Sequence, residues 1–293
     1  MNIAHKATGL LLYGIFKLSG YLPLRVLYLK ADVLAFLFGR VFRYRYQVVV
    51  QNLSRSFPDK NYKEIRALVR SFYRHFFRVF AEVVRSQGMS EAEAKQRFAI
   101  KNPELIRQLH DNKNNIIALG GHTGNWEWLI MTPLFFSFSI YTLYKPLSSG
   151  TAEVLMAKIR RRFGLKLLTM QQAGRYILSK QDFPALYFFV GDQSPSHRNT
   201  EYRFGFLNQP SFFFNGGARL ATATGSAVIY QSINRIKPGY YEITHQLISV
   251  PGDGMTDREI LGKYVSLLEA DIQRQPECWL WSHKRWKHRA DTP

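Results

Sequence analysis

The sequence predicts an α/β fold, a mixed and largely parallel sheet flanked by helices, with membrane-associated helices at the N-terminus. Three observations predict it. Short apolar runs alternate with helical segments from residue 100 onward. Residues 7–39 are mostly apolar, and 293 residues with 46% hydrophobic and 15% aromatic content suffice for one large core. We expect a hydrophobic anchor over residues 1–45 and a globular domain over residues 46–293.

The N-terminal segment, residues 7–39, has no uncharged stretch of the roughly 18 residues that a clear transmembrane helix needs. It is interrupted by Lys17, Arg25, Lys30 and Asp32, and it is followed by Arg40, Arg43 and Arg45. We interpret it as one or two helices embedded in, or lying against, a cytoplasmic-facing membrane. The alternative is an ordinary pair of buried helices.

A helix is predicted over residues 62–84 by apolar positions at helical spacing. One of its faces carries Arg66, Arg70, Arg74 and Arg78, each four residues after the last. Like charges at this spacing repel each other on a helix. The row therefore indicates a phosphate-rich partner surface, although a merely solvated basic face explains it equally well.

The globular part is predicted to contain buried strands over residues 115–119, 139–143, 185–190 and 227–230, with a further candidate over residues 240–250. Helices are expected to begin near Asn125, Thr151, Gln171 and Gly216. Thr256 and Glu259 form a capping box that opens a helix through Gln273. This alternation of strands and helices is the basis for the predicted sheet.

The most informative stretch is GGHTGNWEW, residues 120–128, which follows a buried strand. It places His122 at the carboxyl end of a strand, where active sites of open α/β sheets lie. With His122 in the loop and Glu127 in the first helical turn, the two side chains can converge. Glu127 would then orient the imidazole, and His122 would act as general base toward a substrate hydroxyl. A purely structural histidine is the alternative.

Other catalytic classes lack their signatures in this sequence. There is no G-x-S-x-G elbow, H-E-x-x-H helix, P-loop or G-x-G-x-x-G motif. The single cysteine, Cys278, excludes an intramolecular disulfide and a cysteine-based zinc cluster, and we predict no metal site. For a developing oxyanion, the backbone N–H groups around Gly124 and Asn125 are plausible donors.

Two further groups of residues bear on substrate binding. One is the basic run Lys158, Arg160, Arg161, Arg162 and Lys166, which suits phosphate but also suits a solvated helix end. The other is Asp192-Gln193, which follows a strand and so lies at the same sheet edge as His122 if the strands are parallel. Asp192 equally suits a structural role, capping a turn.

The charge balance, 40 Lys and Arg against 21 Asp and Glu, gives a formal net charge of +19 and calls for an anionic partner. The segment PECWLWSHKRWKHR, residues 276–289, mixes tryptophan with basic residues. That composition suits a membrane interface or single-stranded nucleic acid, and tryptophans packed into the core explain it as well. No nucleic-acid-binding signature accompanies the charge, so we predict no nucleic-acid partner.

The motifs together resemble the bacterial lipid A late acyltransferases, which are lauroyl/myristoyl acyltransferases of the lysophospholipid acyltransferase superfamily. The resemblance covers nearly the whole chain and is carried by YRYQVVVQNLSRSFPD, GGHTGNWEW, YKPL with RRRFG, GDQSP and ECWLWSHKRW. It implies a glycerol-3-phosphate acyltransferase-like α/β domain over residues 46–293. It also implies an acyl-carrier-protein-dependent O-acyltransferase with no cofactor, acting at the cytoplasmic side of the cell inner membrane.

The resemblance also implies roles for individual residues. His122 matches the catalytic base and Glu127 its acidic partner. Arg161, with Arg160 and Arg162 as competitors, matches the basic residue of the second block, and Asp192 and Gln193 match a substrate-positioning pair. Lys145 and Asn125 complete the expected substrate-binding set. The expected partners are acyl carrier protein, a phosphorylated glycolipid acceptor (a lipid A precursor) and an anionic membrane; a lysophospholipid or aminolipid acceptor is the alternative.

Overall fold

The computed structural model describes residues 3–195 and 202–287 of the chain. A seven-stranded sheet has the order β1-β9-β8-β2-β5-β3-β4. Its neighbours are parallel except for the antiparallel pair β8 and β9. The strands are β1 Phe98–Ile100, β2 Ile116–Gly120, β3 Ile140–Tyr144, β4 Lys166–Thr169, β5 Leu186–Val190, β8 Ala227–Lys237 and β9 Tyr240–Ser249. The predicted mixed, largely parallel sheet is confirmed.

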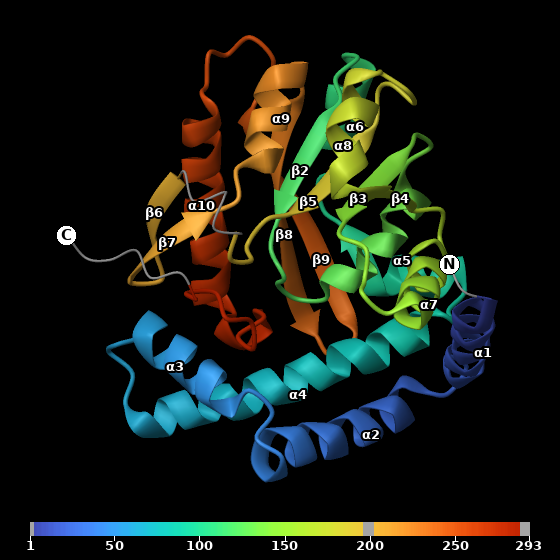
Figure 1. The fold of residues 1–293 in the computed structure, drawn as a ribbon, viewed down its shortest axis with the longest axis vertical. Helices are drawn as coiled ribbons and strands as arrows, with labels where there is room; N and C mark the ends of the chain where they lie inside the picture. The colour runs from blue at the N-terminus through green and yellow to red at the C-terminus, as the bar shows by residue number, and fades with distance from the viewer. Residues whose placement is uncertain (1–2, 196–201, 288–293) are drawn as a thin grey trace.

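Helices cover both faces of this sheet and one of its ends (Figure 1). They are α1 Ile3–Ser19, α2 Leu24–Phe36, α3 Tyr46–Ser56, α4 Tyr62–Ser86, α5 Glu91–Arg97, α6 Pro103–Asp111, α7 Gly150–Arg160, α8 Met170–Leu178, α9 Gly216–Thr224 and α10 Asp257–Arg274. The long helix α4 runs across one end of the sheet, with α2 on its far side and α3 beside its first half (Figure 1). A separate antiparallel hairpin, β6 Tyr202–Phe206 and β7 Gln209–Phe213, lies beside α10.

The predicted capping box and one of the predicted helix starts lie where the sequence places them. Thr256 Oγ1 accepts the backbone N–H of Glu259, whose carboxylate accepts the N–H of Thr256, so α10 begins where the sequence predicts. The helix near Gly216 also begins at the expected residue. The start of α10 depends on residues three apart in the chain, which is why sequence alone locates it.

The segment after His122 differs in kind from the expected α-helix. Residues Trp126–Phe135 form a 3-10 helix, η2, with Pro133 inside it. Proline has no N–H to donate, and its ring disfavours a regular α-helix around it. The strands β1, β4, β6 and β7 were not expected from the sequence; β1 and β4 have only three and four residues.

The N-terminal helices pack on the rest of the chain, α1 against α7 and α2 against α4. A short π-helix, η1 Leu37–Val41, follows α2. Within residues 3–195 and 202–287, no helix is both long enough and apolar enough to cross a bilayer. The association of these helices with a membrane therefore stays a prediction.

The tryptophans of the ECWLWSHKRW segment belong to the core. Trp281 is fully buried, and Trp279 is 3% exposed and packs edge-on against it. Arg285, from the same segment, is also buried and lies over the ring of Phe213. Of the three interpretations of this segment, core packing is the one that the structure supports.

Candidate active site

His122 and Asp192 are brought together by the register of two parallel strands. β2 pairs with β5 so that Gly120 lies opposite Val190. Each of the two functional residues follows its strand by two positions, so they meet at the carboxyl edge of the sheet. Asp192 Oδ1 lies 2.6 Å from His122 Nδ1, and Asp192 Oδ2 accepts the backbone N–H of His122 at 2.8 Å. Asp192 is thus the carboxylate that orients the imidazole.

The expected orientation of His122 by Glu127 is not what the structure shows. Both carboxylate oxygens of Glu127 accept hydrogen bonds from Arg160, at 2.7 and 3.1 Å. Glu127 still acts on His122 electrostatically, because its negative charge favours the protonated imidazole. The strand order explains the difference. Glu127 is close to His122 in the sequence, but Asp192 is close to it in space because β5 lies next to β2 in the sheet.

Burial and the opposite charge of the partner act against each other on the pKa values of both His122 and Asp192. Burial lowers the pKa of His122, but the charge and hydrogen bond of Asp192 raise it by more, so it lies above its usual value. Burial raises the pKa of Asp192, and hydrogen bonds from His122 and Trp279 outweigh that effect, so Asp192 stays ionised. With the proton on Nδ1, His122 Nε2 carries the free lone pair of a base.

Two glycines make this turn possible. A Cβ on Gly121 would lie 2.5 Å from Leu268 Cδ1 and 3.3 Å from Asp192 Oδ2. Gly124 has a φ of +56°, and a Cβ there would lie 2.8 Å from the backbone oxygen of Ile233. Larger residues at either position would displace the turn that carries His122.

A second buried histidine fastens the same turn from behind. His75 Nε2 lies 2.9 Å from the carbonyl oxygen of Gly124, and Arg235 approaches His75 Nδ1 at 3.0 Å. Arg235 is in turn paired with Glu277 at 2.5 Å. Burial and the Arg235 cation lower the pKa of His75 to about 3, so this ring is neutral and donates from Nε2 to the Gly124 carbonyl.

Glu82 is a buried carboxylate that fastens the start of η2. It is 1% exposed and accepts four hydrogen bonds, from the hydroxyls of Tyr28 and Tyr241, the amide of Asn125 and the backbone N–H of Gly239. Burial raises the pKa of Glu82, while the four donors favour its ionised form. The carboxylate thereby ties helices α2 and α4 to the β8–β9 turn and to the catalytic loop.

Hydrogen bonds within the fold correct two expectations, that of Asn125 as a substrate contact and that of the Gly124 N–H as an oxyanion donor. The side chain of Asn125 donates to Glu82 instead of facing a substrate, and Asn125 is fully buried. The backbone N–H of Gly124 donates to the carbonyl of Cys278 at 3.0 Å. The Asn125 side chain and the Gly124 N–H are thus both used to hold the loop in place.

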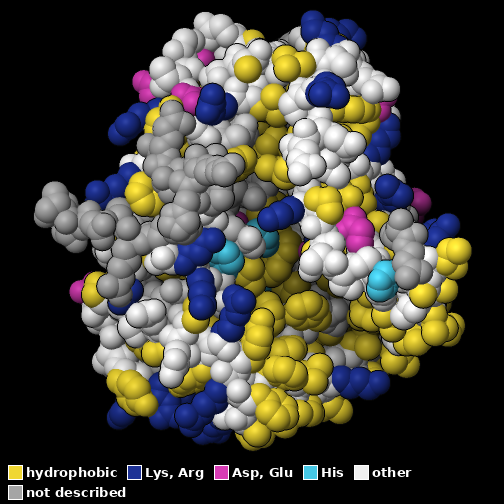
Figure 2. Space-filling view, in the orientation of Figure 1, with side chains coloured by type: hydrophobic (Ala, Val, Ile, Leu, Met, Phe, Trp, Pro, Cys, Tyr) yellow, Lys and Arg dark blue, Asp and Glu magenta, His cyan; other side chains and the backbone are white. Residues whose placement is uncertain are grey.

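Two cavities meet at His122. The larger, of about 760 Å³, is lined mainly by apolar side chains of α1, α2, α4 and α7, among them Phe16, Leu34, Phe80, Leu155 and Met156. The smaller, of about 370 Å³, contains Thr142, Tyr144, Lys145 and Arg160. His122, Trp126, Glu127 and Gln193 line both. Figure 2 shows histidine and basic side chains at the upper end of an apolar hollow.

The remaining predicted substrate residues fall in different places. Gln193 lies beside the base, with its amide nitrogen 3.4 Å from His122 Nε2. Lys145 lines the smaller cavity. Arg161 is exposed, and Arg160 lies in the site in its stead, with 24% of its side chain exposed. Arg162 is used structurally, donating to the carbonyls of Ser86 and Met89.

Several residues of the site were missed from the sequence. Trp279 and the clamp of His75, Arg235 and Glu82 come from segments far from His122 in the chain, so no local motif connects them. Asp192 was predicted at the same sheet edge as His122; what the sequence analysis missed is its role as the hydrogen-bond partner of the imidazole. Within the described ranges, no group of three or more His, Cys, Asp and Glu side chains is arranged to hold a metal ion.

Comparison with known proteins connects this site to one family. The family model described as bacterial lipid A biosynthesis acyltransferase matches residues 2–288. A lipid A biosynthesis palmitoleoyltransferase of Escherichia coli (strain K12) is 18% identical over 247 residues, which cover 84% of this chain and 79% of the relative. A lipid A biosynthesis acyltransferase of Shigella flexneri matches with the same identity and coverage.

Proposed function

This chain belongs to the family of bacterial lipid A biosynthesis acyltransferases, and on that premise we propose that it transfers a fatty acyl chain from acyl carrier protein to a hydroxyl of a lipid A precursor. His122 is the general base of this reaction and Asp192 holds it. The enzyme uses no cofactor; the acyl carrier protein thioester is its co-substrate. Its place of action is the cytoplasmic side of the inner membrane.

The observation that carries the proposal is the position of His122 at the junction of two unlike cavities. The apolar cavity of about 760 Å³ suits an acyl chain, because apolar walls favour burial of methylene groups. The cavity of about 370 Å³ presents Lys145 and Arg160, whose charges suit a phosphorylated sugar. A base between the two lies where the acceptor hydroxyl and the thioester carbonyl have to meet.

The proposed chemistry is direct transfer in two steps. His122 Nε2 takes the proton of the acceptor hydroxyl while its oxygen attacks the thioester carbonyl carbon. The tetrahedral intermediate then collapses, the carbon–sulfur bond breaks, and the imidazolium returns the proton to the departing thiolate. The products are an ester and a free thiol, and the base is regenerated. We propose the amide N–H of Gln193 as a donor to the developing oxyanion, and its position beside His122 Nε2 supports this role.

The test is acyl-carrier-dependent transfer to a lipid A precursor by wild type and His122→Ala. Removing a general base costs about 10²–10⁴-fold in rate, so the variant should lose nearly all activity. The matched control is His110→Ala on α6, where the ring stacks on Phe138 away from both cavities. It should retain wild-type activity.

Two results would count against the proposal. Equal activity of wild type and His122→Ala would remove His122 from the chemistry. A wild-type enzyme that leaves the lipid A precursor untouched but acylates a lysophospholipid or aminolipid would keep the chemistry and replace the acceptor. Mass spectrometry of the product lipids separates the two cases.

A further inference from the structure

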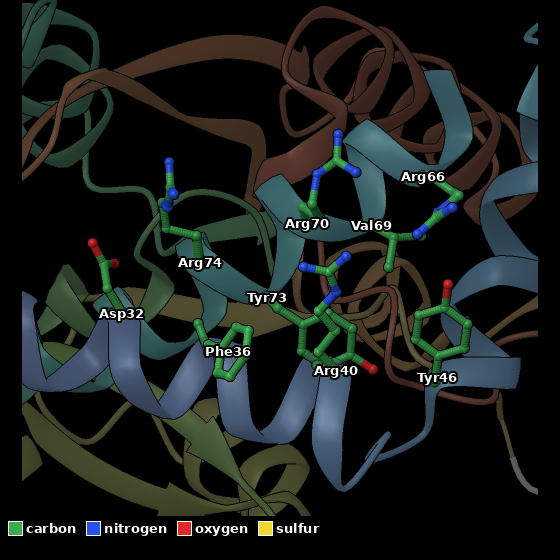
Figure 3. A pocket seen from close by; sticks show the side chains of 11 residues that line it. Asp32, Phe36, Arg40, Tyr46, Arg66, Val69, Arg70, Tyr73 and Arg74 are labelled. Atoms are coloured by element: carbon green, nitrogen blue, oxygen red, sulfur yellow. The ribbon is translucent and has the colours of Figure 1, made fainter. Parts of the chain in front are cut away.

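A small arginine-lined pocket lies between α4 and the α2–η1 segment, apart from both cavities at His122. It has a volume of about 170 Å³ and is lined by Arg40, Arg66, Arg70 and Arg74. In Figure 3, Arg40 rises from the α2–η1 segment toward α4, while the other three arginines project from α4. None of its lining residues also lines the catalytic cavities. We call it the arginine pocket.

The four arginines of this pocket have no acidic partner. Within residues 3–195 and 202–287, none of them forms an ion pair or a side-chain hydrogen bond, and Arg66 only stacks over the ring of Tyr62. Arg78, the next member of the same row, is different. It binds both oxygens of Asp32, at 2.8 and 2.6 Å. The fold therefore neutralises Arg78 and leaves the rest of the row charged.

That difference points to an anion from outside the chain. Arginines four residues apart on one helix face repel each other, and Arg40 adds a fourth charge opposite them. Asp32 is in the pocket wall, but its charge is already balanced by Arg78. Guanidinium groups bind phosphate oxygens in pairs. A volume of about 170 Å³ accommodates a phosphate group with a few waters, but not a folded partner.

The surroundings of the pocket favour one source of phosphate. Large apolar side chains on the same α2–η1 segment are exposed: Val33 52%, Phe36 56%, Val41 56% and Phe42 65%. Phe36 also lines the pocket itself. Apolar side chains next to basic ones are typical of surfaces that rest at the head-group level of a bilayer. A soluble phosphate compound would leave these apolar side chains exposed to water.

We infer that the arginine pocket binds the phosphate of an anionic phospholipid head group and so orients the enzyme on its membrane. The inference rests on the membrane location in the proposed function. Side chains of α2 line both this pocket and the apolar cavity. A head group held at the arginines, with Phe36 and Phe42 in the acyl region, would turn the mouth of that cavity toward the bilayer.

The test is binding of the full chain to vesicles of phosphatidylcholine with and without phosphatidylglycerol. In Arg66→Gln/Arg70→Gln, affinity for the phosphatidylglycerol vesicles should fall about 30-fold, since each basic residue near an anionic surface contributes about fivefold. The matched control, Arg107→Gln/Arg175→Gln, removes the same charge from α6 and α8, which lie away from α2 and α4 in Figure 1. Its affinity should stay within about twofold of wild type.

A second variant separates a built phosphate pocket from general attraction. Arg66→Lys/Arg70→Lys keeps both charges but loses the paired N–H donors, so it should bind phosphatidylglycerol vesicles more weakly than wild type. Equal binding by the lysine variant and wild type would overturn the inference. So would complete displacement from the vesicles by millimolar inorganic phosphate, because a free anion would then be the preferred ligand.

The remaining outcome concerns the acceptor lipid. If the glutamine variant binds vesicles normally but shows a raised KM for the phosphorylated acceptor in detergent, the pocket belongs to the acceptor and the inference fails. Failure of the proposed function looks different. In that case wild type transfers no acyl chain in detergent, while the difference in vesicle binding between wild type and the glutamine variant persists.

Discussion

Two histidines serve the turn of residues 120–125, and their neighbours shift their pKa values in opposite directions. His122 lies in the turn beside the Asp192 carboxylate, which raises its pKa above the usual value against the effect of burial. His75 lies behind the turn beside the Arg235 guanidinium, which acts with burial to lower its pKa to about 3. The two rings therefore have pKa values shifted in opposite directions, and His75 stays neutral at neutral pH.

The comparison shows that the sign of the neighbouring charge distinguishes the two rings: the Asp192 carboxylate favours the protonated form of His122, and the Arg235 guanidinium disfavours that of His75. His122 also reaches two cavities and is 18% exposed, whereas His75 is 4% exposed and bonded at both ring nitrogens. The loop position of a histidine is therefore not enough to identify its role from the sequence. The charged partner, which comes from another strand or helix, has to be known as well.

The largest expected effect comes from removing the partner of the reactive ring. Asp192→Asn should lower kcat on the order of 10³-fold, since the corresponding exchange in a Ser–His–Asp triad costs about 10⁴-fold. The loss of the carboxylate also lowers the pKa of His122. The base must be deprotonated to act, so the acidic limb of the kcat/KM profile should move to lower pH. Rates of acyl transfer measured across pH check both changes.

The contrary outcome is specific. If Glu127→Gln moves the acidic limb further than Asp192→Asn does, Glu127 is the effective partner of His122 in the working enzyme. The hydrogen bond between His122 and Asp192 would then be present only in the enzyme without substrate.

A smaller effect is expected from the second carboxylate of the site. Glu127→Gln removes the partner of Arg160 and a more distant negative charge from His122. We expect a loss of about 10–100-fold, mainly in KM, because Arg160 is then no longer held in the acceptor cavity. A double-mutant cycle with Arg160→Gln checks this assignment. Independent effects of the two substitutions would show that the pair does not act as a unit.

Features that depend on residues close together in the chain were predicted from the sequence, and features that depend on distant residues were not. Strand β5 and the α10 capping box are governed by neighbours in the chain, and both were predicted within a residue or two. The hairpin β6–β7 was missed, and β8 proved to run to Lys237, well beyond its predicted end. These parts depend on pairing with distant segments, which leaves little trace in a single local pattern.

The site shows the same limit at the level of single residues. His122 and Gln193 lie where their motifs predicted. The partner of His122 was misassigned, because sequence distance favours Glu127 while strand order favours Asp192. Arg160 and Arg161 are neighbours in the chain, but the turn of α7 directs one to Glu127 and leaves the other exposed. No pattern of residue types distinguishes these two before the helix is placed.

The smallest expected effect on catalysis comes from the structural ring, and it should appear mainly in stability. Between pH 7 and 5 the unfolded chain protonates its histidines, while His75 with a pKa of about 3 remains neutral in the fold. A folded-state pKa below the unfolded value means that stability is lost as pH falls, here by about 2 kcal/mol for this one group. His75→Gln should remove this contribution to the pH dependence of the free energy of unfolding. Glutamine can still donate to Gly124 and accept from Arg235, but it does not titrate.

His245→Gln is the matched control, because it separates titration from support of the turn. His245 is 3% exposed in β9, and burial lowers its pKa to about 4. Urea unfolding at pH 7 and pH 5 should show the same flattened pH dependence for both variants. Acyl transfer should fall severalfold only for His75→Gln, since glutamine holds the Gly124 carbonyl less rigidly than the ring does. Equal activity of the two variants would mean that the turn keeps His122 in place without the hydrogen bond from His75. The position of His122 would then not depend on His75.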